Sequence, residues 1–181
     1  GSASTDFYGT LEPFAAEAVY FIVTDRFVDG DPGNNFEDQG GVNGSFDNPV
    51  QLEGERPGNI GYLGGDFRGV LDHAEYIAEM GFTAVWLTPI VDNPDESFTG
   101  GIRPGEGFGA DKGKSGYHGY WGVNFFVVDE HLESPGLTFA DLTRTLRDEH
   151  GLKFAQDVVT NHGSPAYTVP GDQPKYSELD S

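Results

Sequence analysis

The chain has 181 residues, with 10 basic and 30 acidic side chains, so its formal net charge is −20 at neutral pH. A surface of this charge repels phosphate groups, which argues against binding to nucleic acid or to an anionic membrane. The sequence has no cysteine, which excludes disulfides and thiolate metal sites, and it has no run of about 18 apolar residues that would predict a membrane span.

The first half of the chain predicts a strand, a long loop and a helix. Residues 19–24 are apolar and rich in β-formers, which is typical of a buried strand. Residues 25–65 are rich in Gly, Asn, Asp and Pro, and loops of this length are usually functional. Residues 67–80 carry apolar side chains at helical spacing, with Asp66 as the expected N-cap and Gly81 as the expected end.

The second half predicts the same order of elements. Residues 83–88 are expected to form a second buried strand, which a further Gly-rich loop follows. A helix is expected to begin near Thr138, with Asp141 as its capping-box partner, and to end at Gly151. Residues 153–159 then predict a third strand.

The order strand, helix, strand, helix, strand predicts an α/β fold with a parallel sheet and right-handed crossovers. Such a sheet fits either a doubly wound fold or an incomplete barrel. No Gly-rich nucleotide-binding motif follows the first strand. Polar pairs follow each expected strand, at Asp25-Arg26, Thr88-Pro89 and Asn161-His162. Barrel enzymes carry their chemistry at this face, and doubly wound enzymes use the same edge.

The loop after the first strand contains a candidate calcium site. Asp29, Asp31, Asn34 and Asn35 bring four side-chain oxygen donors within seven residues, and calcium takes six to eight oxygen ligands. The spacing does not match an EF-hand. Asp, Gly and Asn also form Asx-turns without any metal, so composition leaves both interpretations open.

The segment DVVTNH, residues 157–162, ends the third expected strand. An acid in an apolar strand is unfavourable unless it is paired, so Asp157 is either a catalytic group or a buried anchor, and the residues favour the anchor. Asn161 and His162 lie just past the strand, where a metal or a substrate could reach them. A structural role for His162 is equally compatible with the sequence.

The stretch GYHGYWGVNFF, residues 116–126, combines aromatic rings, a histidine and glycines. Aromatic faces stack on the apolar faces of sugars, and a neutral histidine can donate to sugar hydroxyls. Packing that pins a long loop is the alternative for Tyr120 and Trp121. We assign Phe125 and Phe126 to such packing.

Together these segments resemble the α-amylase family, glycoside hydrolase family 13. The resemblance rests on five stretches in the order of the family, which cover nearly all of the chain after its first dozen residues: VYFIVTDRFVDGDPGNN (19–35), GGDFRGV (64–70), GFTAVWLTPI (81–90), GYHGYW (116–121) and DVVTNH (157–162). It implies an incomplete (β/α)8 TIM barrel, of which residues 1–162 form the first three strands and two helices. Residues 163–181 would begin the inserted domain B.

The resemblance also implies Ca²⁺ as a cofactor at two sites. A structural site found in some members, including cyclodextrin glucanotransferases, matches one set of positions here: Asp29, Asp31, Asn34, Asn35, Gly64 and Asp66. Asp31 stands where those members often have Asn. Asn161 matches a ligand of the more widespread site between the barrel and domain B.

The resemblance further implies a sugar subsite at the cleaved bond. His118, Tyr120, Trp121 and His162 match the positions that line it, with Tyr120 stacked on the ring and the histidines bonded to hydroxyls. Asp157 matches an aspartate that organises the site and is not the nucleophile. The expected partner is an α-glucan oligosaccharide or polysaccharide.

Retaining glycoside hydrolysis needs two carboxylates about 5 Å apart. In the family these groups come from the fourth, fifth and seventh strands, so we expect no catalytic residue in this segment and no activity from it alone. The remainder of the enzyme would follow, as the continuing chain or as a separate chain, and truncation or nicking in domain B would leave such a segment. A cyclodextrin-forming or otherwise transglycosylating member is one alternative.

A non-catalytic, calcium-dependent carbohydrate-binding protein of the same fold is a second alternative, and an unrelated doubly wound enzyme is a third. The acidic, lysine-poor composition suits an ordinary secreted protein or a high-salt environment, where salt screens the self-repulsion. We therefore expect a secreted or extracellular protein, with the high-salt question open.

Overall fold

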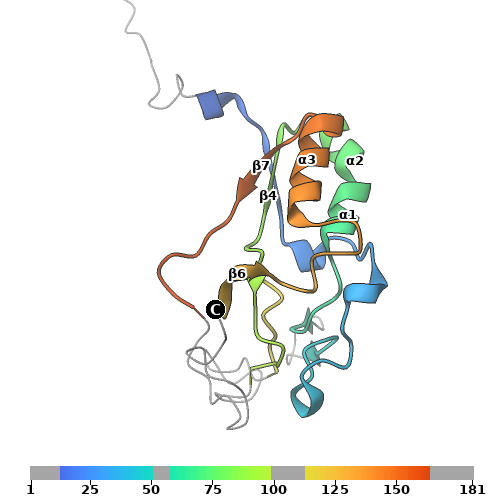
Figure 1. Cartoon of the computed structure of the whole chain (residues 1–181), viewed down its shortest axis with the longest axis vertical. Helices are drawn as coiled ribbons and strands as arrows, with labels where there is room; N and C mark the ends of the chain where they lie inside the picture. The colour runs from blue at the N-terminus through green and yellow to red at the C-terminus, as the bar shows by residue number, and fades with distance from the viewer. Residues whose placement is uncertain (1–12, 51–57, 99–112, 164–181) are drawn as a thin grey trace, which may run out of the picture.

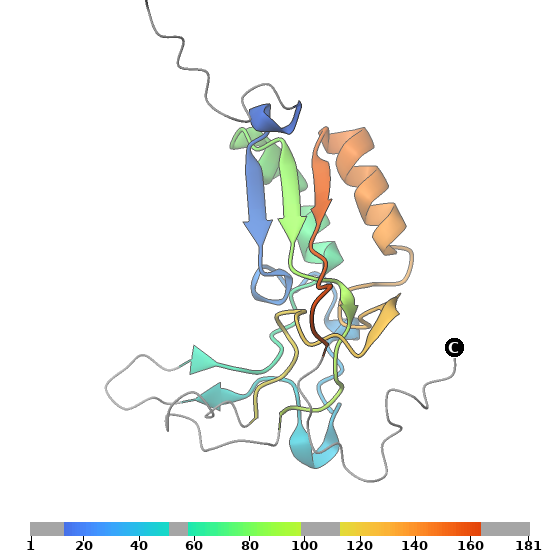
Figure 2. The same cartoon turned by 90° about the vertical axis from the view of Figure 1, so that its left-hand side faces the viewer.

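The computed structural model of the chain describes residues 13–50, 58–98 and 113–163. Its centre is a parallel sheet of three strands in the order β1 (Val19–Ile22), β4 (Ala84–Leu87) and β7 (Lys153–Gln156). Figure 2 shows the three strands side by side and pointing the same way, toward the long loops. The predicted parallel sheet is therefore confirmed.

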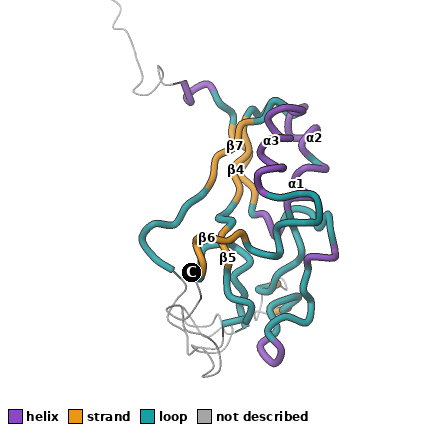
Figure 3. The backbone as a smooth tube through the Cα atoms, viewed as in Figure 1, coloured by secondary structure: helices purple, strands orange, loops and turns teal. Residues whose placement is uncertain are grey.

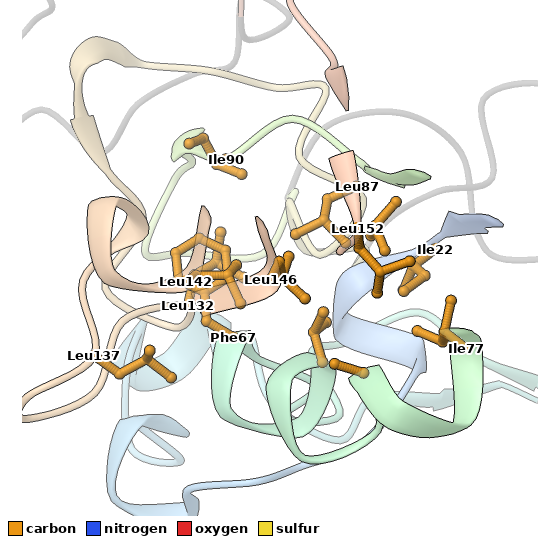
Figure 4. Close-up of a cluster of buried hydrophobic side chains, with 13 residues drawn as sticks. Ile22, Phe67, Ile77, Leu87, Ile90, Leu132, Leu137, Leu142, Leu146 and Leu152 are labelled. Carbon is orange, nitrogen blue, oxygen red and sulfur yellow. The ribbon is translucent and has the colours of Figure 1, made fainter. Parts of the chain in front are cut away.

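Helices cover one face of this sheet. They are α1 (Phe67–Asp72), α2 (Ala74–Glu79) and α3 (Phe139–His150), which lie together beside the strands in Figure 1. The core between sheet and helices is shown in Figure 4, and its fully buried side chains include Phe67, Val70, Ile77, Val85, Leu87, Leu142, Leu146 and Leu152. Because strand residues alternate between faces, Phe21 and Trp86 point to the other side, where they are 46% and 41% exposed.

The caps predicted from sequence are present. Asp66 accepts a hydrogen bond from the Gly69 N–H at 2.7 Å, and Thr138 and Asp141 form a reciprocal capping box. Gly151 ends α3 in the left-handed conformation, with φ 66°. These local signals fixed the helix ends correctly because each involves residues within one turn of the chain.

The predicted helix over residues 67–80 is instead two helices. The break lies at His73, which has φ −110° and ψ 9°, and whose Nδ1 lies 2.9 Å from the Gly69 carbonyl oxygen. The apolar spacing continues across this break because Val70, Ala74 and Ile77 all enter the core. Periodicity alone therefore could not reveal the interruption.

The third strand is shorter than predicted and ends at Gln156. Asp157 consequently lies just past the strand and is half-buried, which removes the expected acid inside an apolar strand. The expected domain B falls on residues 163–181, of which only Gly163 lies within the described residues.

An antiparallel pair beyond the main sheet was not predicted. Strand β5 (Val91–Asp92) pairs with β6 (Asn124–Val128). The assignment of Phe125 and Phe126 to the core is wrong, since they are 38% and 96% exposed. Neighbouring residues in a strand point to opposite faces, so both rings could not enter one core.

The long loop over residues 25–65 is not structureless within its described part. It contains the 3₁₀ turns η2 (Thr24–Arg26), η3 (Pro32–Asn34) and η4 (Gly41–Asn43), and the short strands β2 (Pro49–Val50) and β3 (Gly58–Asn59) pair antiparallel. A further 3₁₀ turn, η1 (Pro13–Ala16), precedes β1. Figure 3 shows the loops that follow β1 and β4 gathered below the sheet, whereas η1 lies at its upper end. No helix of the described ranges has the length and apolar character needed to cross a bilayer.

Candidate functional site

The loop after β4 and the end of β7 meet at the Asp157 carboxylate. The Tyr120 hydroxyl donates to Asp157 Oδ2 at 2.8 Å, and Trp86 Nε1 donates to the same oxygen at 3.3 Å. Burial raises the pKa of Tyr120 to about 12, and the hydrogen bond to Asp157 adds to this effect. The hydroxyl therefore stays protonated at neutral pH and remains a donor to the carboxylate.

Two histidines hold the backbone of Tyr120. The Tyr120 N–H donates to His118 Nδ1 at 3.0 Å, and His162 Nε2 lies 3.1 Å from the Tyr120 carbonyl oxygen. The rings of His118 and Trp121 meet edge to face with centroids 4.7 Å apart. The backbone N–H of Trp121 donates to Asn93 Oδ1 at 2.9 Å. The structure thus brings the predicted subsite residues His118, Tyr120, Trp121 and His162 together around one turn of backbone.

Gly119 explains why this turn can lie so close to the strand end. It has φ 80°, and a Cβ at this position would lie 2.1 Å from the Pro89 carbonyl oxygen. Only glycine fits such an approach, so the second glycine of GYHGYW positions the aromatic residues around it against the end of β4.

The predicted calcium loop brings two side-chain oxygen atoms together beside Gly64. Gly64 has φ 87°, and a Cβ there would lie 2.4 Å from Asn35 Oδ1 and 2.9 Å from Asp29 Oδ2. Asn34 Oδ1 and Asn35 Oδ1 are buried and have no hydrogen-bond partner among the described residues. Unpaired buried amide oxygens are unfavourable, and an oxygen-seeking cation would satisfy them. The residues present therefore fit a calcium ion.

Two predicted ligands of this loop also have structural roles. Both oxygens of Asp66 accept hydrogen bonds, from Gly30 N at 3.1 Å and Gly69 N at 2.7 Å on one side, and from Asp31 N at 2.9 Å and Asn34 Nδ2 at 3.2 Å on the other. The Asp31 carboxylate accepts from Gly33 N at 2.9 Å, which is an Asx-turn. Asp66 thus ties the loop to the start of α1.

Asn161 is the predicted ligand of the second calcium site. Its side chain is exposed, and Asn161 Oδ1 lies 3.1 Å from His162 Nδ1. The predicted calcium site that would include Asn161 stays a prediction.

A buried polar group lines a pocket at the ends of β1 and β4, and sequence reasoning missed most of it. Its walls include Asp25, Tyr62, Asp129 and His131. Asp129 Oδ1 lies 2.8 Å from His131 Nδ1, and the rings of His131 and Tyr62 stack with centroids 3.9 Å apart. The available signal was the segment DEH at 129–131, which directly follows the apolar run NFFVV.

Two acidic side chains at or near this pocket, Asp25 and Asp92, have raised pKa values. Burial raises the pKa of Asp25 to about 6. The hydrogen bond that the Leu63 N–H donates to this carboxylate acts in the opposite direction and lowers the pKa. Burial, followed by the charges of Asp129, Glu130 and Asp95, raises the pKa of Asp92 to about 7. Asp92 therefore lies among several other carboxylates whose charges oppose its ionisation, whereas Asp25 is paired with the Arg26 guanidinium.

Comparison with known proteins places these features in a family. A family model described as alpha amylase, catalytic domain, matches residues 21–176. The chain is 33% identical over 156 residues to a cyclomaltodextrin glucanotransferase from Klebsiella oxytoca, a match that covers 86% of this chain and 20% of that protein. It is 31% identical over 169 residues to an alpha-amylase from Saccharomycopsis fibuligera, covering 92% and 27%.

Solved structures give the same result. The chain resembles CldA, a cyclomaltodextrin glucanotransferase, with a TM-score of 0.62 at 31% identity, over 83% of this chain and 27% of that one. It also resembles the alpha-amylase from Geobacillus thermoleovorans, solved with acarbose, with a TM-score of 0.51 at 33% identity, over 84% and 24%. The chain therefore spans about a quarter of the length of these proteins.

Proposed function

Because the chain belongs to the alpha-amylase catalytic-domain family, whose fold is a TIM barrel, we propose that it is the N-terminal part of an enzyme that cleaves or transfers α-glucans. The hydrogen bond from Tyr120 to Asp157 is the observation that carries this proposal. It joins the aromatic loop to the end of β7, at the face of the sheet where barrel enzymes bind their substrates.

In this proposal the aromatic loop forms the wall of a sugar subsite. Asp157 holds the hydroxyl end of the Tyr120 side chain, and His118 and His162 hold the backbone that carries it. A ring held in this way can stack on the apolar face of a glucose unit without losing further rotamer freedom. Trp121 extends this wall beside Tyr120, since its indole meets the His118 imidazole edge to face.

The calcium loop has a supporting role in the proposal. Asp29, Asn34 and Asn35 would supply side-chain oxygens to the ion, which would neutralise the Asp29 carboxylate and satisfy the two unpaired amide oxygens. The same loop contacts the start of α1 through Asp66, so a bound ion would stiffen the approach to the sheet end. The ion has no part in the chemistry of bond cleavage in this account.

The catalytic carboxylates belong to a part of the protein outside these 181 residues. Retaining cleavage requires a nucleophile and an acid/base about 5 Å apart, and the resemblance assigns both to later strands. Asp157 is committed to Tyr120 and Trp86, so it serves here to organise the subsite. The segment alone is therefore proposed to be inactive.

The test uses the full protein that contains this chain, with maltoheptaose as substrate. Chromatography of the products should show shorter maltooligosaccharides, longer ones or cyclic ones, depending on the acceptor. Binding of maltoheptaose without any of these products would favour a carbohydrate-binding role. If the full protein neither binds maltoheptaose nor converts it, the proposal is overturned.

A further inference from the structure

A second group of potential metal ligands lies where β5 and the end of β6 meet the loop over residues 36–45. Asp92, Asp95 and Glu130 each bring a carboxylate oxygen within 4.8 Å of the others. Asp129, Glu130 and His131 form an overlapping set at the same spacing, so Glu130 belongs to both. Because Glu130 is common to both sets, the His131 imidazole lies beside several carboxylates.

His131 is oriented as metal-binding histidines usually are. Its side chain is buried, its Nδ1 lies 2.8 Å from Asp129 Oδ1, and its ring is stacked on Tyr62. Its Nε2 is buried and has no hydrogen-bond partner among the described residues. A carboxylate that holds one imidazole nitrogen and leaves the other facing a ligand is the usual second shell of a metal-bound histidine.

Asp129 is already occupied and is better placed to orient His131 than to bind an ion. Its Oδ1 also accepts a hydrogen bond from the backbone N–H of His131 at 3.0 Å, and its Oδ2 accepts one from the backbone N–H of Asn93 at 2.9 Å. Among the described residues, Asp92 and Asp95 accept no side-chain hydrogen bond and Glu130 accepts one, from Gln39, so these three carboxylates keep oxygen atoms available for a cation.

Gln39 adds an independent sign of a missing ligand. Its Nε2 donates to Glu130 Oε1, while its Oε1 is buried and unpartnered within the described part of the chain. A half-turn of the amide would direct the oxygen toward Glu130, which is a favourable arrangement only with a cation between them. The Gln39 loop also contacts the β5 side, because the Ser97 N–H donates to the Asn43 carbonyl at 2.9 Å.

We propose that this cluster binds one divalent transition-metal ion, such as Mn²⁺ or Zn²⁺. Its ligands would be Asp92, Asp95, Glu130 and the His131 Nε2 atom, with the side-chain oxygen of Gln39 as a further ligand. An imidazole among the ligands favours such ions over Ca²⁺, whereas the loop around Asn35 offers only oxygen. The ion would neutralise the cluster and fasten the 36–45 loop to the β5–β6 pair.

The experiment measures Mn²⁺ binding to the full protein by the electron paramagnetic resonance signal of free Mn²⁺, with Ca²⁺ in saturating excess. The wild type should bind one equivalent of Mn²⁺, and Zn²⁺ should displace it. Asp95→Asn, at an exposed position, and His131→Gln should each weaken binding about 10-fold or more. Glu37→Gln, an exposed change in the same loop, and Asn35→Ala in the calcium loop should leave Mn²⁺ affinity unchanged.

Absence of Mn²⁺ binding under excess Ca²⁺ would overturn the proposal, since it would leave a solvated acidic cluster or a second calcium site. Binding that survives Asp95→Asn with unchanged affinity would also overturn it. If His131→Gln does not fold, the result for Asp95→Asn decides alone. Loss of Mn²⁺ binding in Asn35→Ala would show that the ion occupies the calcium loop and would overturn the assignment to this cluster.

Discussion

The Tyr120 hydroxyl donates a 2.8 Å hydrogen bond to Asp157 across a sequence separation of 37 residues. The contact links the loop after β4 to the end of β7, and Trp86 at β4 donates to the same carboxylate oxygen. One acid thereby fixes two aromatic side chains from separate elements. Asp157 can organise an aromatic subsite in this position without itself contacting a reacting bond.

Removal of the Tyr120 hydroxyl tests whether this link matters for activity. Tyr120→Phe keeps the ring but leaves Asp157 with one donor fewer, so the ring can rotate out of the orientation suited to stacking. In the full protein we expect kcat/KM for maltoheptaose to fall about 10-fold, which corresponds to about 1.4 kcal/mol, in the range of one hydrogen bond to a charged group.

Tyr76→Phe is the matched control, because Tyr76 lies on α2 and is 54% exposed. It should leave kcat/KM within a factor of two of the wild type, roughly the effect of a neutral surface change. Equal losses in both variants would mean that Tyr120 acts through general stability and not through the subsite.

The calcium loop predicts a stability gain from calcium that depends on Asn35. Calcium at about 100 times its dissociation constant should raise the free energy of unfolding by about 2.7 kcal/mol. Asn35→Ala removes a buried oxygen from the cluster beside Gly64 and should abolish most of this gain. Thermal unfolding with calcium and with a chelator measures it, and Asp38→Asn, exposed in the same loop, should respond like the wild type.

Asp66 should stabilise the fold even without calcium. Its carboxylate caps α1 and accepts four hydrogen bonds from the calcium loop and the first turn of the helix. Asp66→Ala in the presence of chelator is expected to lower the free energy of unfolding by about 2–4 kcal/mol, from a lost cap and unsatisfied buried donors. Asp72→Ala, at the exposed end of the same helix, should change it by less than about 0.5 kcal/mol in urea unfolding.

The cap of α3 predicts a specific acid dependence. The hydrogen bonds from Thr138, together with Arg144, lower the pKa of Asp141 to about 2. A lowered folded-state pKa contributes stability above the unfolded value near 4, and this contribution is lost as the pH falls through about 2. Between pH 4 and 2, the loss of stability should therefore be smaller in Asp141→Asn than in the wild type.

Glu149→Gln, on the exposed face of the same helix, provides the comparison. Unfolding by urea at each pH gives the curves for all three proteins. A wild-type curve that runs parallel to that of Asp141→Asn would show that the capping box does not depend on the charge of Asp141.

The sequence predicted the parts of the molecule that depend on local chemistry. Apolar runs rich in β-formers located the three strands of the sheet, and Asp66, Thr138 and Gly151 marked helix ends because capping involves neighbours in the chain. His118, Tyr120 and His162 could be grouped only because the motif order resembled that of a known family. Their actual contacts, through the Tyr120 backbone, follow from the meeting of two loops.

The missed features depend on long-range contacts. The pairing of β5 with β6 joins residues that lie 32 to 37 positions apart in the sequence, and this pairing exposes Phe126. The stacking of His131 on Tyr62 and its contact with Asp129 depend on how the long loop folds back over the β6 end. Neither composition nor periodicity carries information about such contacts.

The stereochemistry of the first product tests the proposed function most directly. Proton NMR can follow the anomeric configuration of the sugar released from maltoheptaose by the full protein within the first turnovers. We expect the α-configuration to be retained, whether water or another sugar is the acceptor, as two carboxylates in a retaining arrangement require. Initial release of the β-anomer, or no cleavage by the full protein, would contradict the assignment of this chain to a retaining α-glucan enzyme.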